Sequence, residues 1–163
     1  SFFHSSPSSF ASNKKRKMEN RIQIDQIDPK SFKGLLTLEQ YLNDCGMNKT
    51  HVELIKMRAS QVNGCAFCLD MHSKDAIENG ESAQRLFVLN GWRETNFFSE
   101  EEQIILMVTE EVTLIHNGGL STETYNKALS VLGEKYLAQV IMSVVAINAW
   151  NRIAISTHKP ITE

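Results

Sequence analysis

The stretch EKYLAQVIMSVVAINAWNRIAIST, residues 134–157, decides the fold class of this chain of 163 residues. Drawn as a helix, it carries apolar side chains such as Leu137 and Val144 on nearly all of its faces. A helix that is apolar all round must be buried on all sides. Gln139 and Arg152 interrupt the stretch within one span length, which argues against a membrane span. The stretch therefore predicts a core helix, part of whose surface is covered by another subunit.

Glycines and capping residues divide the chain before this stretch into further helical pieces. Gly46, Gly64, Gly80 and Gly91 each follow an apolar segment with helical spacing, as expected of helix ends. The expected helices cover residues 29–45, 50–62, 65–79, 82–90, 99–117, 122–132 and 134–157. No alternating Val, Ile and Thr stretches bounded by hairpin turns occur. The sequence predicts an all-α protein of about six to seven helices.

Two of these helices begin with the spacing of a capping box, a hydroxyl residue followed three positions later by glutamate. Ser99 precedes Glu102, and Thr50 precedes Glu53. We therefore expect Ser99 and Thr50 to be N-cap residues.

The charge balance separates the first seventeen residues from the rest. The chain has 17 basic and 19 acidic residues, a net charge of −2. Residues 1–17 are Ser-rich and aperiodic, and they contain the run Lys14–Lys17 without any acidic residue. We interpret 1–17 as a leader or disordered tail and 18–163 as a single domain with more acidic than basic residues. A transit segment and a basic nuclear-import or nucleic-acid patch are the alternatives for the run.

The cysteine count bears on the compartment. Three cysteines are too few, and odd in number, for a secreted disulfide framework. The chain shows no apolar region of a secretory signal. We expect a cytoplasmic protein that binds neither nucleic acid nor a membrane.

Reactive side chains are concentrated between residues 63 and 72. Cys65 and Cys68 form a C-x-x-C pair that can close a small disulfide, and a helix N-terminus at Cys65 would stabilise a thiolate there. His72 follows Cys68 by one helical turn and could take a proton from its thiol. Glu53 lies twelve residues before Cys65, on the preceding expected helix. Cys45 has no partner in the sequence, and we expect it to lie outside the chemistry.

Each of these residues also has a structural interpretation. Glu53 could do no more than complete the Thr50 capping box, and His72 could be an ordinary buried histidine. Glu53, Cys65, Cys68 and His72 could also form a zinc site. Against zinc, the chain has no second C-x-x-C, and carboxylates are uncommon in closed structural zinc sites.

The stretch VELIKMRASQVNGCAFCLDMHSKDA, residues 52–76, resembles the alkylhydroperoxidase D (AhpD) family, which shares its helical fold with carboxymuconolactone decarboxylases. The block Gly91-Trp-Arg-Glu94 followed by FFSEEEQIILMVTEEVT is similar to stand-alone members of that family. The resemblance covers the chain from Met18 onward and implies an AhpD-like helical bundle that assembles into trimers or hexamers.

The resemblance implies a cysteine-dependent peroxidase that needs no haem, flavin or metal as cofactor. One thiolate would attack a hydroperoxide, the second cysteine would close a disulfide, and an external dithiol would reset the pair. The reductant would be a small thiol or a lipoyl- or thioredoxin-type protein. By this analogy Glu53 and His72 relay protons, Cys68 is the peroxidatic cysteine and Cys65 resolves. The helix dipole by itself would instead favour Cys65 as the peroxidatic cysteine, because it stabilises a thiolate at the helix N-terminus.

The sequence departs from the family pattern at Phe67, where better-known members have a second histidine. Phe67 cannot relay a proton, although it could shield the cysteine pair or contact an apolar peroxide. Two alternative functions stay open: a carboxymuconolactone decarboxylase-like lyase that uses the same cavity, and a non-catalytic thiol redox sensor.

Overall fold

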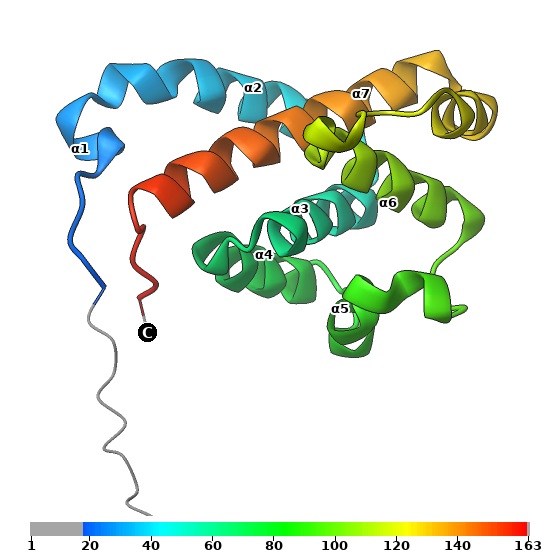
Figure 1. The fold of residues 1–163 in the computed structure, drawn as a ribbon, viewed down its shortest axis with the longest axis horizontal. Coiled ribbons are helices and arrows are strands. Elements are labelled where there is room, and N and C mark those ends of the chain that lie inside the picture. The colour runs from blue at the N-terminus through cyan, green and yellow to red at the C-terminus, as the bar shows by residue number, and fades with distance from the viewer. Residues whose placement is uncertain (1–17, 163) are drawn as a thin grey trace, which may run out of the picture.

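The computed structural model describes residues 18–162, and everything regular in that range is helical. The expected all-α fold is confirmed (Figure 1). Residues 18–162 form seven α-helices, at Ile24–Ile27 (α1), Lys33–Asp44 (α2), Lys49–Asn63 (α3), Ala66–Glu78 (α4), Ala83–Val88 (α5), Glu100–Thr113 (α6) and Thr122–Ser156 (α7). Short 3-10 helices occupy Pro29–Phe32, Leu89–Glu94 and Ile115–Asn117. The expected leader, residues 1–17, lies outside the described residues.

The core forms where α3, α6 and α7 pack against one another. Each of these helices contributes fully buried side chains, for example Ile55 from α3, Ile105 from α6 and Val140 and Val144 from α7. In Figure 1, α4 lies along α3. Helix α2 lies at the top of the view, beside α7. Burial of this apolar surface is the main source of stability for such a bundle.

Helix α7 contains a break that matches the two helices expected from the sequence. Gly133 has φ 75° and ψ 163°, a combination that is accessible essentially to glycine alone. By length and composition, α7 is the one helix of residues 18–162 that could cross a membrane. Its second part instead supplies Val140, Val144 and Ile147 to the core. The expectation of a core helix is confirmed.

Of the two expected capping boxes, one is confirmed and one is wrong. The Ser99 hydroxyl accepts from the Glu102 amide, and the Glu102 carboxylate accepts from the Ser99 amide. Helix α3, however, begins at Lys49, and its N-cap is Asn48, whose Oδ1 accepts from the Thr50 amide at 2.8 Å. Thr50 therefore lies inside the first turn. Glu53 therefore does not cap α3, and the capping box does not explain why a glutamate occupies this position.

The helix expected at residues 82–90 ends earlier than predicted and continues differently. α5 stops at Val88, and a 3-10 helix carries the chain on to Glu94, through Gly91. This segment is tied to the core by Glu110 on α6. Glu110 accepts from the Trp92 indole at 2.9 Å and pairs with Arg93 and Arg58, each at 2.7 Å. The Trp-Arg pair therefore fastens this segment to α3 and α6.

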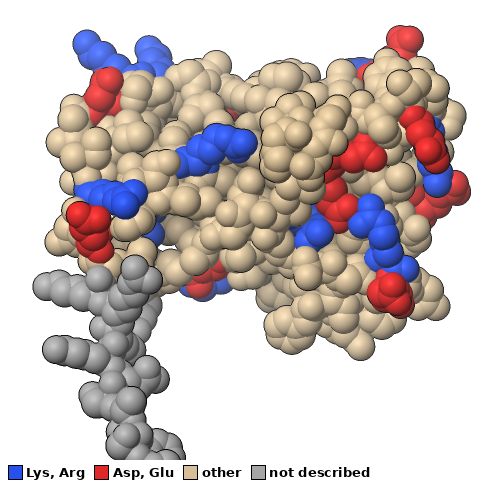
Figure 2. Space-filling view, in the orientation of Figure 1, with Lys and Arg blue, Asp and Glu red and all other residues tan. Residues whose placement is uncertain are grey.

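Charged side chains are interspersed on the face shown in Figure 2, and neither sign forms a broad continuous area there. Large parts of the same face carry no charge at all. Nothing on this face indicates a nucleic-acid surface, which would need a continuous basic area.

Candidate active site

The C-x-x-C pair is placed by the turn between α3 and α4. Gly64 ends α3 with φ 69°, a left-handed conformation that favours glycine. Cys65 then has extended backbone angles and is the N-cap of α4. Its Sγ accepts from the Cys68 amide at 3.3 Å, and its own amide donates to Ser60 O at 3.0 Å. Cys65 and Cys68 are joined by a disulfide, with their Cα atoms 5.3 Å apart.

The two sulfurs have different surroundings. Both cysteines are buried, and with Phe67 they pack against Ala154 of α7. Cys68 lines a cavity of about 400 Å³, whereas Cys65 does not. From the cavity, Cys68 is therefore the accessible half of the disulfide.

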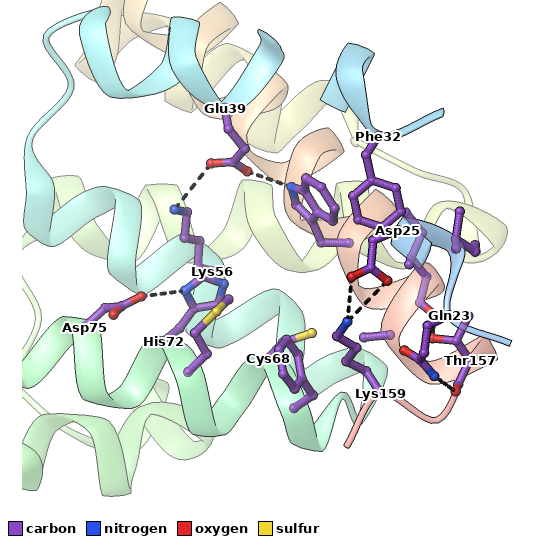
Figure 3. Close-up of a pocket in the computed structure, with 16 residues that line it drawn as sticks. Gln23, Asp25, Phe32, Glu39, Lys56, Cys68, His72, Asp75, Thr157 and Lys159 are labelled. Carbon is purple, nitrogen blue, oxygen red and sulfur yellow. Dashed lines mark hydrogen bonds and ion pairs between the residues drawn. The ribbon is translucent and has the colours of Figure 1, made fainter. Parts of the chain in front are cut away.

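The cavity lies between the N-terminal segment, α2, α3, α4 and α7 (Figure 3). Its apolar walls and its polar groups come from different parts of the chain. The apolar side chains are Ile24, Phe32, Phe67, Met71, Trp150, Ile153 and Ala154. The polar ones are Gln23, Asp25, Glu39, Lys56, Cys68, His72, Asp75, Thr157 and Lys159. Although nine of the sixteen lining residues are polar, most of the exposed cavity surface is apolar, as is typical of a small-molecule site.

His72 lies on the cavity wall one turn after Cys68, as the spacing predicts. Its Nδ1 is 3.5 Å from Asp75 Oδ2, which is within ion-pair distance, but it makes no hydrogen bond of good geometry. Burial, and to a smaller extent Lys56, lower the pKa of His72 to about 4 against the opposing effect of Asp75. His72 is therefore neutral at pH 7 and can accept a proton.

Glu53 is buried on α3 but is not on the cavity wall. Its Oε2 has no hydrogen-bond partner. Burial raises the pKa of Glu53, Lys56 opposes this, and Asp75 and Glu39 add to it. The charges of Lys56 and Asp75 also shift the pKa of His72. The pKa values of Glu53 and His72 therefore depend on the same two neighbouring charges.

Sequence reasoning missed Lys56 and the residues that hold it. Lys56 Nζ is 3.6 Å from Glu39 Oε2, and Glu39 Oε1 accepts from the Trp150 indole at 3.0 Å. Lys56 follows Glu53 by one helical turn, so this spacing could have indicated it. Glu39 on α2 and Trp150 on α7 carry no such local signal.

Sequence reasoning also missed the N-terminal wall of the cavity. Gln23 donates from Nε2 to Thr157 O at 2.9 Å, and Lys159 pairs with both carboxylate oxygens of Asp25 at 3.3 and 3.4 Å. These contacts fasten the segment around α1 to the chain that follows α7. Figure 3 shows them at the side of the cavity away from His72.

Two further expectations concern metal and Cys45. Residues 18–162 contain no group of three or more His, Cys, Asp or Glu side chains arranged to hold a metal ion. A zinc site at Glu53, Cys65, Cys68 and His72 would therefore require these side chains to rearrange. Cys45 is a free thiol that donates to Leu42 O at 3.2 Å and does not line the cavity of Cys68.

Comparison with known proteins identifies the family. The sequence pattern of the carboxymuconolactone decarboxylase family matches residues 29–111. The chain is 38% identical over 139 residues to the uncharacterized protein YdfG of Bacillus subtilis. This alignment covers 85% of this chain and 95% of YdfG. The chain belongs to the carboxymuconolactone decarboxylase family.

Solved structures agree with this assignment. ATU0492 of Agrobacterium tumefaciens, a protein of unknown function proposed to be an antioxidant defence protein AhpD, is 32% identical with a TM-score of 0.86. The match covers 89% of this chain and 99% of that one. The debrominase Bmp8 is 14% identical with a TM-score of 0.75, covering 84% and 74% of the two chains, and shares the fold. The expected AhpD-like fold is confirmed.

Proposed function

We propose that the protein is a cysteine-dependent peroxidase that reduces hydroperoxides through a dithiol–disulfide cycle of Cys65 and Cys68. The observation that carries the proposal is the position of Cys68, whose side chain lines the cavity together with His72 while Cys65 does not. A peroxide in this cavity would meet Cys68 first. The likeness to ATU0492, which is proposed to be an AhpD and has the same fold over 99% of its length, supports the same chemistry.

The oxidative step begins with the reduced pair. The Cys68 thiol loses its proton to neutral His72, and the thiolate attacks the terminal oxygen of ROOH. The O–O bond breaks as an S–O bond forms, so the sulfur is oxidised to a sulfenic acid and the peroxide is reduced. The leaving RO⁻ takes a proton from the His72–Glu53 group and departs as an alcohol, or as water when the peroxide is H₂O₂. The unpaired carboxylate oxygen of buried Glu53 suits a role in this relay.

Disulfide formation completes the cycle. The Cys65 thiol attacks the Cys68 sulfenic sulfur, an S–S bond forms and water leaves. The turn at Gly64 already holds the two cysteines at a Cα separation that permits the bond. An external dithiol then reduces the disulfide by exchange and is itself oxidised. A small thiol or a lipoyl- or thioredoxin-type protein of the cytoplasm would supply these electrons.

The test is stopped-flow mixing of the fully reduced protein with hydrogen peroxide or cumene hydroperoxide, followed by mass spectrometry of the peptide that holds both cysteines. We expect rapid loss of two hydrogens in the parent. Cys65→Ser should stop at a sulfenic acid on Cys68 that dimedone traps, and Cys68→Ser should not react. Cys45→Ser is the matched control and should behave as the parent does.

The proposal fails if both serine variants consume peroxide at the parental rate, or if the reduced pair survives peroxide for minutes. Activity toward a carboxylated lactone that persists without either cysteine would instead indicate a decarboxylase-like lyase. An oligomer that changes on oxidation without turnover would indicate a redox sensor.

A further inference from the structure

The disulfide of the proposed cycle is enclosed by the protein. Cys65 and Cys68 are 1% and 2% exposed, and of the two only Cys68 lines the cavity. Reduction requires a thiolate of the reductant to reach one of the two sulfurs, so the approach leads through the cavity to Cys68. A cavity of about 400 Å³ suits a small molecule, but it cannot enclose a dithiol that another protein carries. One wall of the cavity must therefore move before such a reductant can react.

The walls of the cavity differ in how firmly they are attached to the core. Helices α2, α3, α4 and α7 each carry buried side chains. None of residues 18–32 is buried, and Ile22 and Ile27 are 67% and 71% exposed. Segments that bury little apolar surface open at the lowest cost in free energy. The N-terminal segment is therefore the wall that moves most easily.

Two hydrogen bonds to the C-terminal end of α7 hold the start of this segment. Arg21 Nη1 donates to Ser156 O, and Gln23 Nε2 donates to Thr157 O, each at 2.9 Å. The other amide atom of Gln23, Oε1, is buried and has no hydrogen-bond partner within residues 18–162. A buried acceptor without a partner costs free energy, which opening would recover because water could then reach this oxygen. The closed position is therefore only weakly favoured.

An ion pair holds the same segment beside the reactive sulfur. Lys159 Nζ is 3.3 Å from Asp25 Oδ2, and the two side chains are 30% and 42% exposed. Salt screens ion pairs with this degree of exposure, and they contribute little to stability. In Figure 3, the Asp25–Lys159 pair lies on the Cys68 side of the cavity. Separation of Asp25 from Lys159 would therefore open the cavity beside Cys68.

The far end of the segment is attached more firmly. Phe32 packs against Trp150 of α7, with 5.3 Å between the ring centroids. A contact between two aromatic rings is stronger than an exposed polar contact. The part of the segment that can move then comprises residues 19–27, which precede the 3-10 helix at Pro29–Phe32.

We propose that residues 19–27 form a gate over Cys68, which opens at the Asp25–Lys159 pair and admits a dithiol carried by another protein. The inference rests on the proposed function, since it concerns the reduction of the same disulfide.

The exchange behind the open gate has two steps. A thiolate of the reductant attacks Cys68 Sγ, the bond to Cys65 breaks, and Cys65 leaves as a thiolate that takes up a proton. The second thiol of the reductant then loses its proton and attacks the reductant's own sulfur in the mixed disulfide, which releases Cys68. The reductant is oxidised to a disulfide, and the cysteine pair gains two electrons and two protons.

The experiment measures reduction of the disulfide without any peroxide. Diamide first closes the disulfide, and the protein is then mixed with either reduced thioredoxin or dithiothreitol. N-ethylmaleimide traps free thiols at successive times, and mass spectrometry follows the peptide that holds both cysteines. Asp25→Asn should speed reduction by thioredoxin about two- to fivefold, the factor expected for loss of one exposed ion pair. Dithiothreitol is small enough to enter without full opening, so its rate should increase less.

Matched variants separate opening from a change in charge. Asp28→Asn removes an equal charge from the same end of the chain, leaves the Asp25–Lys159 pair intact and should match the parent. Exchange of the two charges, by Asp25→Lys together with Lys159→Asp, should restore slow reduction. Arg21→Met removes the donor to Ser156 O and should speed reduction by thioredoxin as Asp25→Asn does. Circular dichroism shows whether each variant keeps the helical fold.

Two results would overturn the inference. The first is reduction of folded Asp25→Asn and Arg21→Met by thioredoxin at the parental rate. The second is an equal gain in rate for thioredoxin and dithiothreitol, because a change in the redox potential of the pair, rather than in access, would speed both reductants alike.

Failure of the inference and failure of the proposed function can be told apart. A parent that turns over peroxide, with gate variants that are reduced at the parental rate, would remove the gate alone. A parent that does not reduce peroxide, with a diamide-closed disulfide that thioredoxin reduces faster in Asp25→Asn, would remove the peroxidase and leave the gate.

Discussion

At the scale of single residues, the surroundings of the side chains in the redox window separate their roles. Cys65 and Cys68 are almost equally buried, yet only Cys68 lines the cavity. His72 and Glu53 are both buried and incompletely hydrogen-bonded. Burial shifts their pKa values in opposite directions, and in each case it favours the neutral form. Buried groups without a full set of hydrogen-bond partners, next to a cavity, are suited to moving protons.

The lowered pKa of His72 predicts a pH dependence of stability. Between pH 6.5 and about 4, the unfolded chain binds a proton at His72 that the native protein does not. The free energy of unfolding should therefore fall as the pH falls through this window, by at most roughly 3 kcal/mol from this group. Urea unfolding of His72→Gln and of the parent should show a shallower pH dependence in the variant.

The raised pKa of Glu53 acts with the opposite sign. Just above the ordinary pKa of a glutamate, the native protein holds the proton longer than the unfolded chain, so protonation of Glu53 stabilises the fold as the pH falls. For this reason the measurement compares His72→Gln with the parent, because both proteins keep Glu53. Identical slopes in the two proteins would contradict the assignment to His72.

At the scale of secondary-structure elements, short-range signals placed most helix limits correctly, and a competing local signal explains the error at α3. Asn48 and Thr50 are both good N-cap residues, and both lie near the start of the helix. Asn48 has the extended backbone of an N-cap and accepts from Thr50, so the helix begins before Thr50. The prediction from the sequence rested on Thr50 alone, because its spacing to Glu53 resembles a complete capping box.

This assignment predicts unequal effects of two alanine substitutions. Asn48→Ala removes the side chain that caps α3 and should lower the free energy of unfolding by about 1 kcal/mol. Thr50→Ala leaves the cap in place and should change it by less than about 0.5 kcal/mol. Thermal or urea unfolding of the two variants side by side is the measurement. A larger loss of unfolding free energy for Thr50→Ala than for Asn48→Ala would indicate that Thr50, not Asn48, is the N-cap of α3.

The break in α7 predicts a second pair of effects. Gly133→Ala should destabilise the protein by roughly 1–3 kcal/mol, because its backbone angles are unfavourable for any residue with a Cβ. The space around Gly133 is open, so the cost is conformational rather than steric. Gly34→Ala, in the first turn of α2 with open space around it, is the matched control and should stabilise the protein by up to about 1 kcal/mol. Equal effects in urea unfolding would show that Gly133 can adopt ordinary angles.

At the scale of the whole molecule, apolar side chains left uncovered on α7 are the surface on which the expected assembly could form. Met142 and Val145 are 39% and 45% exposed and lie on one face of the helix that also builds the core. Wide uncharged areas are visible on the surface in Figure 2. The expected trimer or hexamer stays a prediction, and these residues show where a copy of the chain could pack.

Sedimentation equilibrium tests the assembly. The parent should have the mass of a homo-oligomer, with a trimer or hexamer expected. Val145→Glu should lower that mass, because it places an unpaired charge in an apolar contact. Lys127→Glu, on the exposed part of α7 before the break, is a control for added negative charge and should leave the mass unchanged. A parent that is monomeric at micromolar concentration would contradict the expectation.

The sequence by itself determined the helical class, most helix limits and the nearness of Cys65, Cys68 and His72. These features depend on local physics: apolar periodicity, caps and glycines act within a few residues, and one helical turn fixes the spacing from Cys68 to His72. The same locality explains why the family resemblance could be stated from two short blocks of sequence.

Only the tertiary structure decided which sulfur faces the cavity and which distant side chains line the cavity with it. Glu39, Lys56 and Trp150 come from α2, α3 and α7, and no spacing along the chain relates them. The N-terminal wall, with Asp25 held by Lys159, depends in the same way on contact between the two ends of the domain. Such groups meet because burial of apolar surface brings distant helices together, and that packing is not encoded by any single short segment.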